Sequence, residues 1–484
     1  MNPQRACFIL FLCALCAAFT SRAQIGIVAS NVVYSTLDDA AVVDTSSSTL
    51  FTIGDIVIEG NKQTRPSIIL RELSFYKNDR YSLQVLVDKF NEAKRQLMNT
   101  GLFHDVVVSL QGLQGQNATV RIEVKERWYI FPKPFVKTVD RSLGEWITQK
   151  DMSMDRVNYG IKLTHKNFTG RRDKFHVGFM NGYTKQLSLS YDGLILDKRM
   201  QWTANMGVAM GKNRQVNYMT AENKLVSFKD TADFVHSYFQ SYAELTYRPA
   251  INTRHTFGLA FSTESVPDTV LAMNPNFYAH KKSVRYPEFY YNLSYYNVDF
   301  NPYPTSGVIG EFSFRKKSID HQLNMWQVGA KGALYKPLGK NYFFSLKAAG
   351  MLKLPLKQPY VNQQLLGFNN MYMQGYEYYV VDGVAGGYTK ASFSRQLVNT
   401  VVHIPSERIK RLNHIPFRLY AKVYGNTGYV YNPDAGRNEL NNRLLYSGGV
   451  GLDIVTFYDF IIKVEWSFNQ LNQNGLYLHR KDYF

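Results

Sequence analysis

Residues that could perform acid–base or nucleophilic chemistry are scattered along this sequence. The ten histidines, among them His165, His255, His321 and His414, stand far apart. The sequence has no His-Glu-x-x-His zinc motif, no Gly-x-Ser-x-Gly motif and no phosphate-binding loop. A serine–histidine triad assembles in space, so the order of residues leaves that one alternative open. We therefore expect no enzyme, no catalytic or metal-binding residue and no cofactor.

Two carboxylates, Glu377 and Asp382, lie beside an aromatic run at residues 376–379. Paired carboxylates in a loop are usually solvated, so we expect both to be exposed and assign them no chemistry. If the chain performs no catalysis, its function has to depend on its fold and on what its domains bind.

The first 23 residues have the layout of a secretory signal peptide. Arg5 is the positive end, residues 6–19 are apolar, and a small-residue site precedes cleavage after Ala23. The apolar run is shorter than the roughly 20 residues that a membrane-spanning helix needs. The segment that follows, residues 24–50, is small and polar, and we expect it to be flexible.

All three cysteines, Cys7, Cys13 and Cys16, lie inside this signal peptide. The mature chain then has no disulfide, thiolate metal site or cysteine nucleophile. A lipoprotein is the alternative, because a lipidated cysteine could fall at Cys13 or Cys16. Leu12 and Leu15 precede them where lipoprotein signals have a small residue, which disfavours this alternative.

The chain carries a formal charge of +18, which becomes +16 when Arg5 and Arg22 are removed, and the charge is spread rather than gathered in runs. Nucleic-acid binding does not suit an exported protein. Attraction to anionic lipid headgroups or lipopolysaccharide does, and a plain solvated surface is the alternative.

Residues 51–127 have the pattern of a small α+β domain with the element order β-α-α-β-β. A first strand ends at the turn Gly60-Asn61, and Thr64 is placed to cap a short helix. Ser82 can cap a longer amphipathic helix that stops at Gly101, before two strands. Such a domain buries one sheet face under two helices.

From residue 156 to residue 484 the pattern is one of strands throughout, with residues 128–155 as a linker. Apolar and polar residues alternate, for example along residues 202–210 and 462–469. A soluble sandwich also alternates, so alternation alone does not decide between the two folds.

The length of this region favours a barrel. About 330 residues without a helical segment exceed an ordinary sandwich, and the polar faces carry Lys, Glu and Asn as a wet lumen would. Clustered aromatic residues are typical of membrane interfaces. We predict a mainly β protein with a C-terminal antiparallel transmembrane barrel of about 16 strands. The polar stretches 211–234 and 263–284 are expected to be outward-facing loops.

Residues 56–61 and 100–103 resemble a polypeptide-transport-associated (POTRA) domain, with Gly60, Asn61, Gly101 and Phe103 as its signature. From about residue 51 onward the chain resembles the BamA/TamA family of outer-membrane assembly proteins, also called the bacterial surface-antigen family. The glycines and Asn61 are turn residues first. The family's principal subunit has several such domains in series, whereas this sequence has room for one, which favours an accessory or specialised role.

Three barrel motifs carry the same resemblance. Residues 167–170 resemble the family's first hairpin. Residues 301–307 resemble its mid-barrel turn, with Tyr303, Pro304 and Gly307. Gln374, Gly375 and Tyr376 lie where the family has an arginine-glycine-aromatic motif on a loop that folds back into the barrel. In the family the arginine packs against acidic residues of the wall, so the neutral Gln374 leaves the strength of this contact open. An ordinary loop tip is the alternative for Gly375 and Tyr376.

The resemblance implies an outer-membrane protein of a Gram-negative cell, with the N-terminal domain in the periplasm. It implies assistance to barrel insertion or polypeptide translocation, by strand addition at the POTRA edge and by a weak barrel seam between residues 157–164 and 460–469. Its partners would be client outer-membrane or secreted polypeptides, outer-membrane lipid and lipopolysaccharide, with accessory lipoproteins as further candidates and no nucleic acid. The alternative is a passive pore or surface-binding barrel. The chain ends on Phe484, as many such barrels do.

Overall fold

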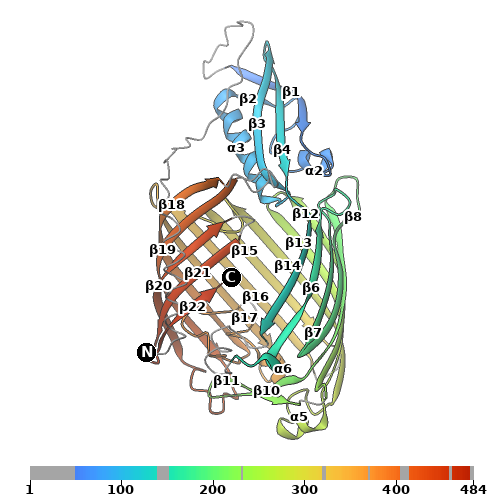
Figure 1. Cartoon of the computed structure of the whole chain (residues 1–484), viewed down its shortest axis with the longest axis vertical. Coiled ribbons are helices and arrows are strands. Elements are labelled where there is room, and N and C mark those ends of the chain that lie inside the picture. The colour runs from blue at the N-terminus through green and yellow to red at the C-terminus, as the bar shows by residue number, and fades with distance from the viewer. Residues whose placement is uncertain are drawn as a thin grey trace.

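The computed structural model describes residues 49–138, 152–230, 233–318, 323–368, 371–403, 414–456 and 460–479. The expected signal peptide, nearly all of residues 24–50, and Phe484 lie outside these ranges. In Figure 1 a small N-terminal domain stands over one end of a large β-barrel. The mainly β fold with one α+β domain is therefore confirmed.

The N-terminal domain is a four-stranded sheet with the order β2-β1-β4-β3, in which β1 is parallel to β4. Its elements are β1 (Leu50–Glu59), α2 (Pro66–Leu70), β2 (Arg80–Ser82), α3 (Leu83–Asn99), β3 (Phe103–Gln114) and β4 (Asn117–Glu126). The expected cap at Thr64 is wrong, because Arg65 is the N-cap residue and the Thr64 hydroxyl instead lies 3.0 Å from Tyr129 Oη.

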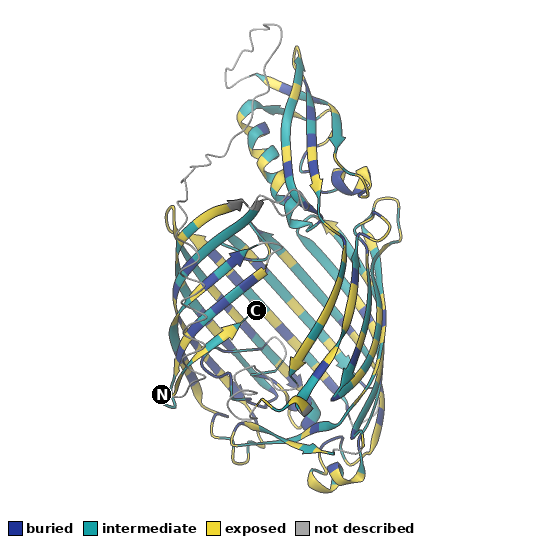
Figure 2. Ribbon diagram, in the orientation of Figure 1, coloured by how far each residue is buried: buried dark blue, intermediate teal, exposed yellow. Residues whose placement is uncertain are grey.

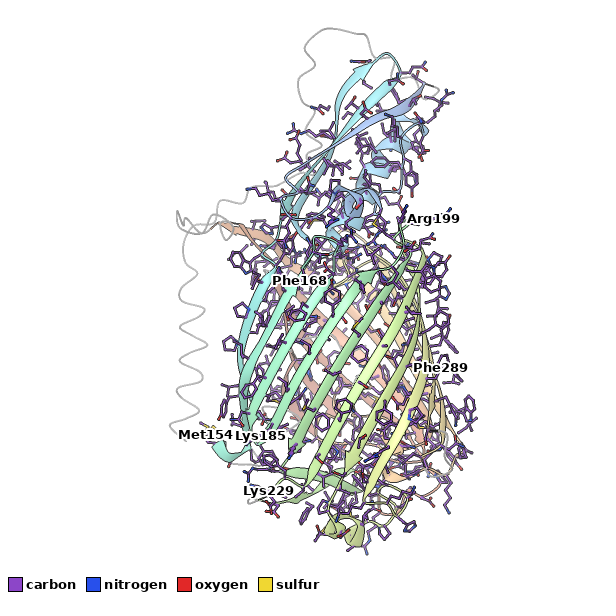
Figure 3. The ribbon with its side chains drawn as sticks, turned by 90° about the vertical axis from the view of Figure 1, so that its right-hand side faces the viewer. Met154, Phe168, Lys185, Arg199, Lys229 and Phe289 are labelled. Carbon is purple, nitrogen blue, oxygen red and sulfur yellow. The ribbon has the colours of Figure 1, made fainter. Side chains whose placement is uncertain are left out.

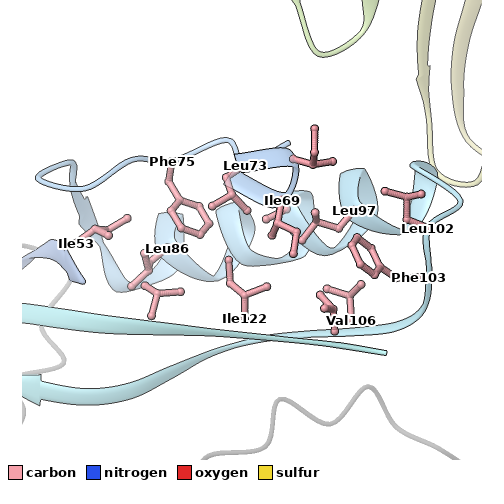
Figure 4. Close-up of a cluster of buried hydrophobic side chains, with 14 of the residues drawn as sticks. Ile53, Ile69, Leu73, Phe75, Leu86, Leu97, Leu102, Phe103, Val106 and Ile122 are labelled. Atoms are coloured by element: carbon pink, nitrogen blue, oxygen red, sulfur yellow. The ribbon is translucent and has the colours of Figure 1, made fainter. Parts of the chain in front are cut away.

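The core of this domain lies between α3 and the sheet. Leu86 and Leu97 of α3 pack toward Phe103 and Ile122 of the sheet, as Figure 4 shows, and all four are fully buried. The three- and four-residue spacing of the apolar residues of α3 places them on one helix face. Phe103 of the expected signature is thus a core residue.

The turn after β1 requires glycine. Gly60 has φ +85°, and an added Cβ would lie 2.0 Å from the Val124 carbonyl oxygen. We expect Gly60→Ala to destabilise this domain by about 1–3 kcal/mol through backbone strain, before any cost of the clash. Hydrogen exchange of residues 51–127 in the full chain measures the effect. Gly112→Ala in β3, where a Cβ meets nothing within 4 Å, is the control, and equal exchange in the two variants would contradict the prediction.

Sixteen antiparallel strands form the barrel, as the length of the region predicts. They are β5 (Ile130–Thr138), β6 (Val157–Lys166), β7 (Lys174–Gly182), β8 (Thr184–Ile195), β9 (Trp202–Asn213), β12 (His236–Ala250), β13 (Thr253–Ser265), β14 (Ser283–Val298), β15 (Gly307–Lys317), β16 (Met325–Pro337), β17 (Tyr342–Leu354), β18 (Ala385–His403), β19 (His414–Tyr431), β20 (Leu444–Thr456), β21 (Phe460–Asn469) and β22 (Asn474–His479).

The two ends of this sheet differ from the expected seam. Residues 130–138, assigned to the linker 128–155, form β5, and residues 474–479 form β22; these are the end strands. Residues 157–164 and 460–469 belong to β6 and β21, each one strand in from an end. The sequence pattern does not predict β5, because Pro132 and Pro134 are atypical of a strand interior. Within the described residues, no backbone pairing joins β5 to β22.

The outer face of the barrel is apolar. Leu259 is 64% exposed and Phe289 is 42% exposed, although each lies in the middle of a strand. Figure 3 shows Phe289 on the wall, with Phe168 and Arg199 toward the N-terminal domain and Lys185 and Lys229 toward the other end. A soluble sandwich would bury such residues, so their exposure decides for the barrel. Among the described helices, none combines the length and apolar character that crossing a bilayer requires.

The end of the barrel away from the N-terminal domain carries the longer connections. The hairpin β10 (Gln215–Ala221) and β11 (Lys224–Lys229) and the helix α5 (Asp268–Met273) lie there, as does α6 (Tyr360–Gln363) (Figure 1). A single 3₁₀ turn, η1 (Met154–Arg156), precedes β6. The described parts of the expected loops 211–234 and 263–284 are therefore in this region, although residues 211–213, 263–265 and 283–284 belong to β9, β13 and β14.

Candidate functional site

Four charged side chains on β19, β20 and β21 form what we call the interior cluster: Lys422, Asp453, Lys463 and Glu465. Lys422 Nζ lies 2.6 Å from Asp453 Oδ1 and 2.6 Å from Glu465 Oε1, and all four residues are buried. Lys463 Nζ is 4.0 Å from Asp453 Oδ2. In Figure 2 buried positions alternate along β20 and β21, the inward face that the cluster occupies. Because an unpaired buried charge is very costly, each member depends on the others.

The loop between β17 and β18 reaches the interior cluster. Gln374 Nε2 donates to Glu465 Oε1 at 3.0 Å, and the Gln374 carbonyl accepts from Ser447 Oγ at 2.5 Å. Gly375 has φ +87° and its carbonyl accepts from Asn469 Nδ2 at 2.7 Å. Tyr376 is 3% exposed and its hydroxyl donates to the Tyr446 carbonyl at 3.0 Å. The loop motif thus lies inside the barrel and not at a loop tip.

Gln374 keeps the contact to an acidic wall residue that the resemblance assigns to an arginine, but it brings no charge. Lys422 supplies the positive charge from the wall itself, at 2.6 Å from the same oxygen of Glu465. The neutral loop residue is therefore compatible with a closed contact, because Lys422 on β19 supplies the counter-charge to Glu465.

The turn between β14 and β15 reaches the same cluster from the other end of the barrel. Tyr303 is 9% exposed, its hydroxyl donates to Asp453 Oδ2 at 2.9 Å, and its ring lies 4.7 Å from the ring of Tyr420. Pro304 lines the adjoining cavity. Gly307 has φ +110°, and a Cβ there would lie 2.0 Å from the Asn297 carbonyl oxygen, so it has a turn role.

The last described strand, β22, also contacts this region. His479 Nε2 lies 2.7 Å from Tyr372 Oη, 3.4 Å from Glu377 and 3.4 Å from Glu465. Tyr372 also donates to Glu377. The loop, the wall and the last described strand are therefore linked through His479.

The expectation that Glu377 and Asp382 are solvated is wrong. Glu377 is 5% exposed and Asp382 is 2% exposed, because the loop that carries them packs inside the barrel. Burial raises the pKa of the Asp382 carboxyl to about 6. Glu377 accepts from the Gly375 backbone N–H at 3.1 Å and so stabilises the turn of the motif.

We expect Gln374→Ala to release the loop from the wall. The substitution removes the hydrogen bond from Gln374 Nε2 to Glu465. Removing a hydrogen bond to a charged acceptor costs about 1.5–3 kcal/mol. Protease cleavage within residues 355–384 should rise, while Gln186→Ala in β8 should leave it unchanged. Equal cleavage in both variants would mean that Gly375 and Tyr376 hold the loop without Gln374.

The interior cluster is an ion-pair network of the wall, to which the turn donates a hydrogen bond from Tyr303 and the loop one from Gln374. In the part of the chain that the structure describes, no group of three or more histidine or acidic residues could hold a metal ion.

Comparison with known proteins shows what the two parts of this chain are similar to. Residues 51–127 match the model of the POTRA family, described as a surface antigen variable number repeat. The curated outer membrane protein assembly factor BamA of Neorickettsia risticii (strain Illinois) is 32% identical over 81 residues, 17% of this chain and 10% of the relative. The chain thus matches about a tenth of the length of this relative.

Two solved structures share the fold over most of the chain. BamA from Haemophilus ducreyi lacking POTRA domains 1–3 has a TM-score of 0.50 at 13% identity. The match covers 89% of this chain and 83% of the BamA chain. The chain is a BamA/TamA-like protein, with a POTRA domain at residues 51–127 before the barrel. CdiB from Escherichia coli has a TM-score of 0.53 at 10% identity. The match covers 90% of this chain and 74% of the CdiB chain. This BamA/TamA-like protein lies in the outer membrane, with its POTRA domain in the periplasm.

The POTRA domain is docked on the periplasmic turns of the barrel through a buried acid that the sequence did not single out. Glu72 accepts two hydrogen bonds from Arg248, at 2.6 and 2.7 Å, and lies 3.2 Å from both Arg71 and Arg172. Its side chain is 2% exposed. Burial by itself would raise the pKa of Glu72, but the three arginines outweigh burial and lower it to about 2.

Hydrogen bonds between uncharged groups also hold the POTRA domain on the barrel. Asn167, in the turn of the first-hairpin motif, donates to Thr64 Oγ1 at 2.9 Å, and its carbonyl accepts from Gln63 at 2.8 Å. Asn99 at the end of α3 donates to the Val298 carbonyl at 3.3 Å and accepts from the Asn301 N–H at 3.2 Å. The first-hairpin and mid-barrel turns therefore both contact the POTRA domain. Gly101 and Asn61 remain turn residues, with Asn61 Nδ2 donating to the Thr64 carbonyl at 3.0 Å.

Proposed function

We propose that this protein assists the insertion of other β-barrels into the outer membrane, or the translocation of polypeptides across it. The observation that carries the proposal is the seam: β5 and β22 are the ends of a sixteen-strand sheet and share no pairing within the described residues. Unpaired backbone groups in lipid are costly. Such a seam therefore favours an incoming strand that supplies hydrogen bonds.

The POTRA sheet offers a second place for strand addition. β3 (Phe103–Gln114) is an end strand of that sheet and pairs only with β4 among the described strands. Backbone groups along a sheet edge accept extended segments of many sequences. We propose that a client segment is held at β3 before it reaches the seam.

A passive pore is disfavoured by what fills the outer end of the barrel. Asn223, at the tip of the β10–β11 hairpin, is 2% exposed; its Nδ2 donates to the Val380 carbonyl at 3.2 Å and its Oδ1 accepts from the Leu440 N–H at 2.9 Å. The hairpin is thus bonded to the loop that carries Gln374 and to the β19–β20 connection. The proposed function predicts little steady ion conductance in planar bilayers.

We propose lipopolysaccharide and accessory lipoproteins as further partners. Lys185 and Lys229 at the outer rim (Figure 3) suit anionic groups of lipopolysaccharide. The POTRA domain, which lies in the periplasm, is where accessory lipoproteins would bind.

Depletion of this protein followed by quantitative proteomics of isolated outer membranes tests the proposed function. A fall in many unrelated barrels is expected for general assembly, and loss of one or a few proteins for a dedicated insertase or secretion pore. Re-expression of the chain should restore the lost proteins. An unchanged outer-membrane proteome would overturn the proposal.

A further inference from the structure

The free edge of β5 can be assigned from its pairing with β6. Ile130 lies opposite His165 at the start of this ladder, and this register places Tyr129 opposite Lys166, whose N–H donates to the Tyr129 carbonyl at 2.8 Å. In an antiparallel pair, alternate residues turn their N–H and C=O groups to opposite sides. The odd-numbered residues of β5 therefore bond to β6, and the even-numbered residues turn their backbone groups toward the seam.

Two of these seam-facing residues are prolines. The even-numbered residues of β5 are Ile130, Pro132, Pro134, Val136 and Thr138. Proline has no N–H. The edge has no donor at Pro132 or Pro134, and of its carbonyls that of Ile130 already accepts from Trp128 Nε1. These positions lie toward the periplasmic end, because Ile130 follows Tyr129, whose hydroxyl lies 3.0 Å from Thr64 of the POTRA domain.

The opposite edge, along Asn474–His479 of β22, has a donor at every seam-facing position that the structure describes. Phe468 lies opposite Asn474 in the β21–β22 ladder, and this register places Asn469 opposite Gln473, whose carbonyl accepts from the Asn469 N–H at 3.0 Å. By the same alternation, the odd-numbered residues of β22 bond to β21. Asn474, Leu476 and Leu478 therefore face the seam, and each has both an N–H and a C=O group.

We propose that Pro132 and Pro134 prevent the periplasmic half of the seam from closing, and that an incoming client strand pairs with β22 and not with that half of β5. A strand placed along β5 would leave its own carbonyls unsatisfied opposite both prolines, in a region without water to replace them. Natural proteins use prolines in this way to blunt sheet edges. The pairing of a client rests on the proposed function, whereas the blunted edge does not.

Amide hydrogen exchange of the purified full-length protein in lipid nanodiscs tests the edge. Pro132→Thr, Pro134→Thr and the double variant restore the missing donors with a strand-favouring residue. We expect the double variant to protect residues 130–138 at least fivefold more than the wild type, with each single variant between them. Pro287→Thr is the control, because Pro287 is exposed on the outer face of β14, a strand paired on both sides. Unchanged exchange of β5 in folded double variant would overturn the proposal.

Site-specific crosslinking to a stalled client strand tests the receiving edge. The mature chain has no cysteine of its own, so single cysteines can be placed at Leu476 or Leu478 on β22 and at Ile130 or Val136 on β5. Crosslinking is expected to be several-fold stronger from β22. Stronger crosslinking from Ile130 would overturn this assignment. If depletion leaves the outer-membrane proteome unchanged, the proposed function fails, while the exchange experiment still decides the role of the prolines.

Discussion

Replacing Lys422 by methionine is expected to destabilise the barrel by about 3–5 kcal/mol, the cost of breaking a buried ion pair by removal of one partner. Lys422 is the cation that lies 2.6 Å from both Asp453 and Glu465. Lys463, at 4.0 Å from Asp453, is too far to replace both contacts. The urea concentration at which the folded barrel is lost in detergent should fall, and protease cleavage of the loop that carries Gln374 should rise with it.

Lys162→Met is the matched control for this prediction. Lys162 lies on β6 and its side chain is exposed, so its loss leaves no buried acid without a partner. The variant that combines Lys422→Met and Lys463→Met with Asp453→Asn and Glu465→Gln removes all four charges together and should recover much of the stability. If Lys422→Met and Lys162→Met lowered the urea midpoint equally, the interior cluster would not stabilise the barrel.

Most of the barrel could be predicted from the sequence because a lipid-facing wall imposes a period of two. Apolar residues such as Leu259 must face outward while their neighbours face the lumen, so the alternation is visible strand by strand. The number of strands then followed from the length of the region. The POTRA domain was predictable for the same kind of reason, since the spacing of apolar residues along α3 fixes one buried helix face.

The interior cluster could not be predicted because its contacts are distant in sequence. Tyr303 and Asp453 are 150 residues apart, and Gln374 and Glu465 are 91 residues apart. Each charged residue of the cluster occupies the polar face of a strand and looks like any lumen residue. Opposite charges on the polar faces of three consecutive strands, β19 to β21, were the available indication. β5 was missed for a different reason, since its prolines are atypical of the strand that it forms.

Glu72→Gln is expected to release the POTRA domain from the barrel. Glutamine has nearly the same shape but leaves Arg71, Arg172 and Arg248 close together without the buried negative charge that holds them, a loss of about 3–5 kcal/mol of docking. The yield of a disulfide between Asn99→Cys on the POTRA domain and Asn301→Cys on the barrel should fall at least tenfold. Glu59→Gln is the control, because the Glu59–Arg121 pair is 2.6 Å long but 43% and 39% exposed, and exposed pairs contribute about 0–1 kcal/mol.

The same contact predicts how docking depends on pH. Glu72 has a pKa of about 2 when docked and an ordinary value of 4.5 when released. Because the docked value is the lower one, the ionised carboxylate stabilises docking fully above about pH 4.5, and this contribution is lost as the pH falls toward 2. The distance between spin labels attached beforehand at Asn99→Cys and Asn301→Cys, with Glu72 unchanged, should therefore stay short at pH 5 and lengthen near pH 2. A distance measurement needs no thiolate at the pH of the experiment. A label distance that stays short at pH 2, or disulfide trapping that survives in Glu72→Gln at neutral pH, would show that Asn167 and Thr64 hold the domain without the arginines.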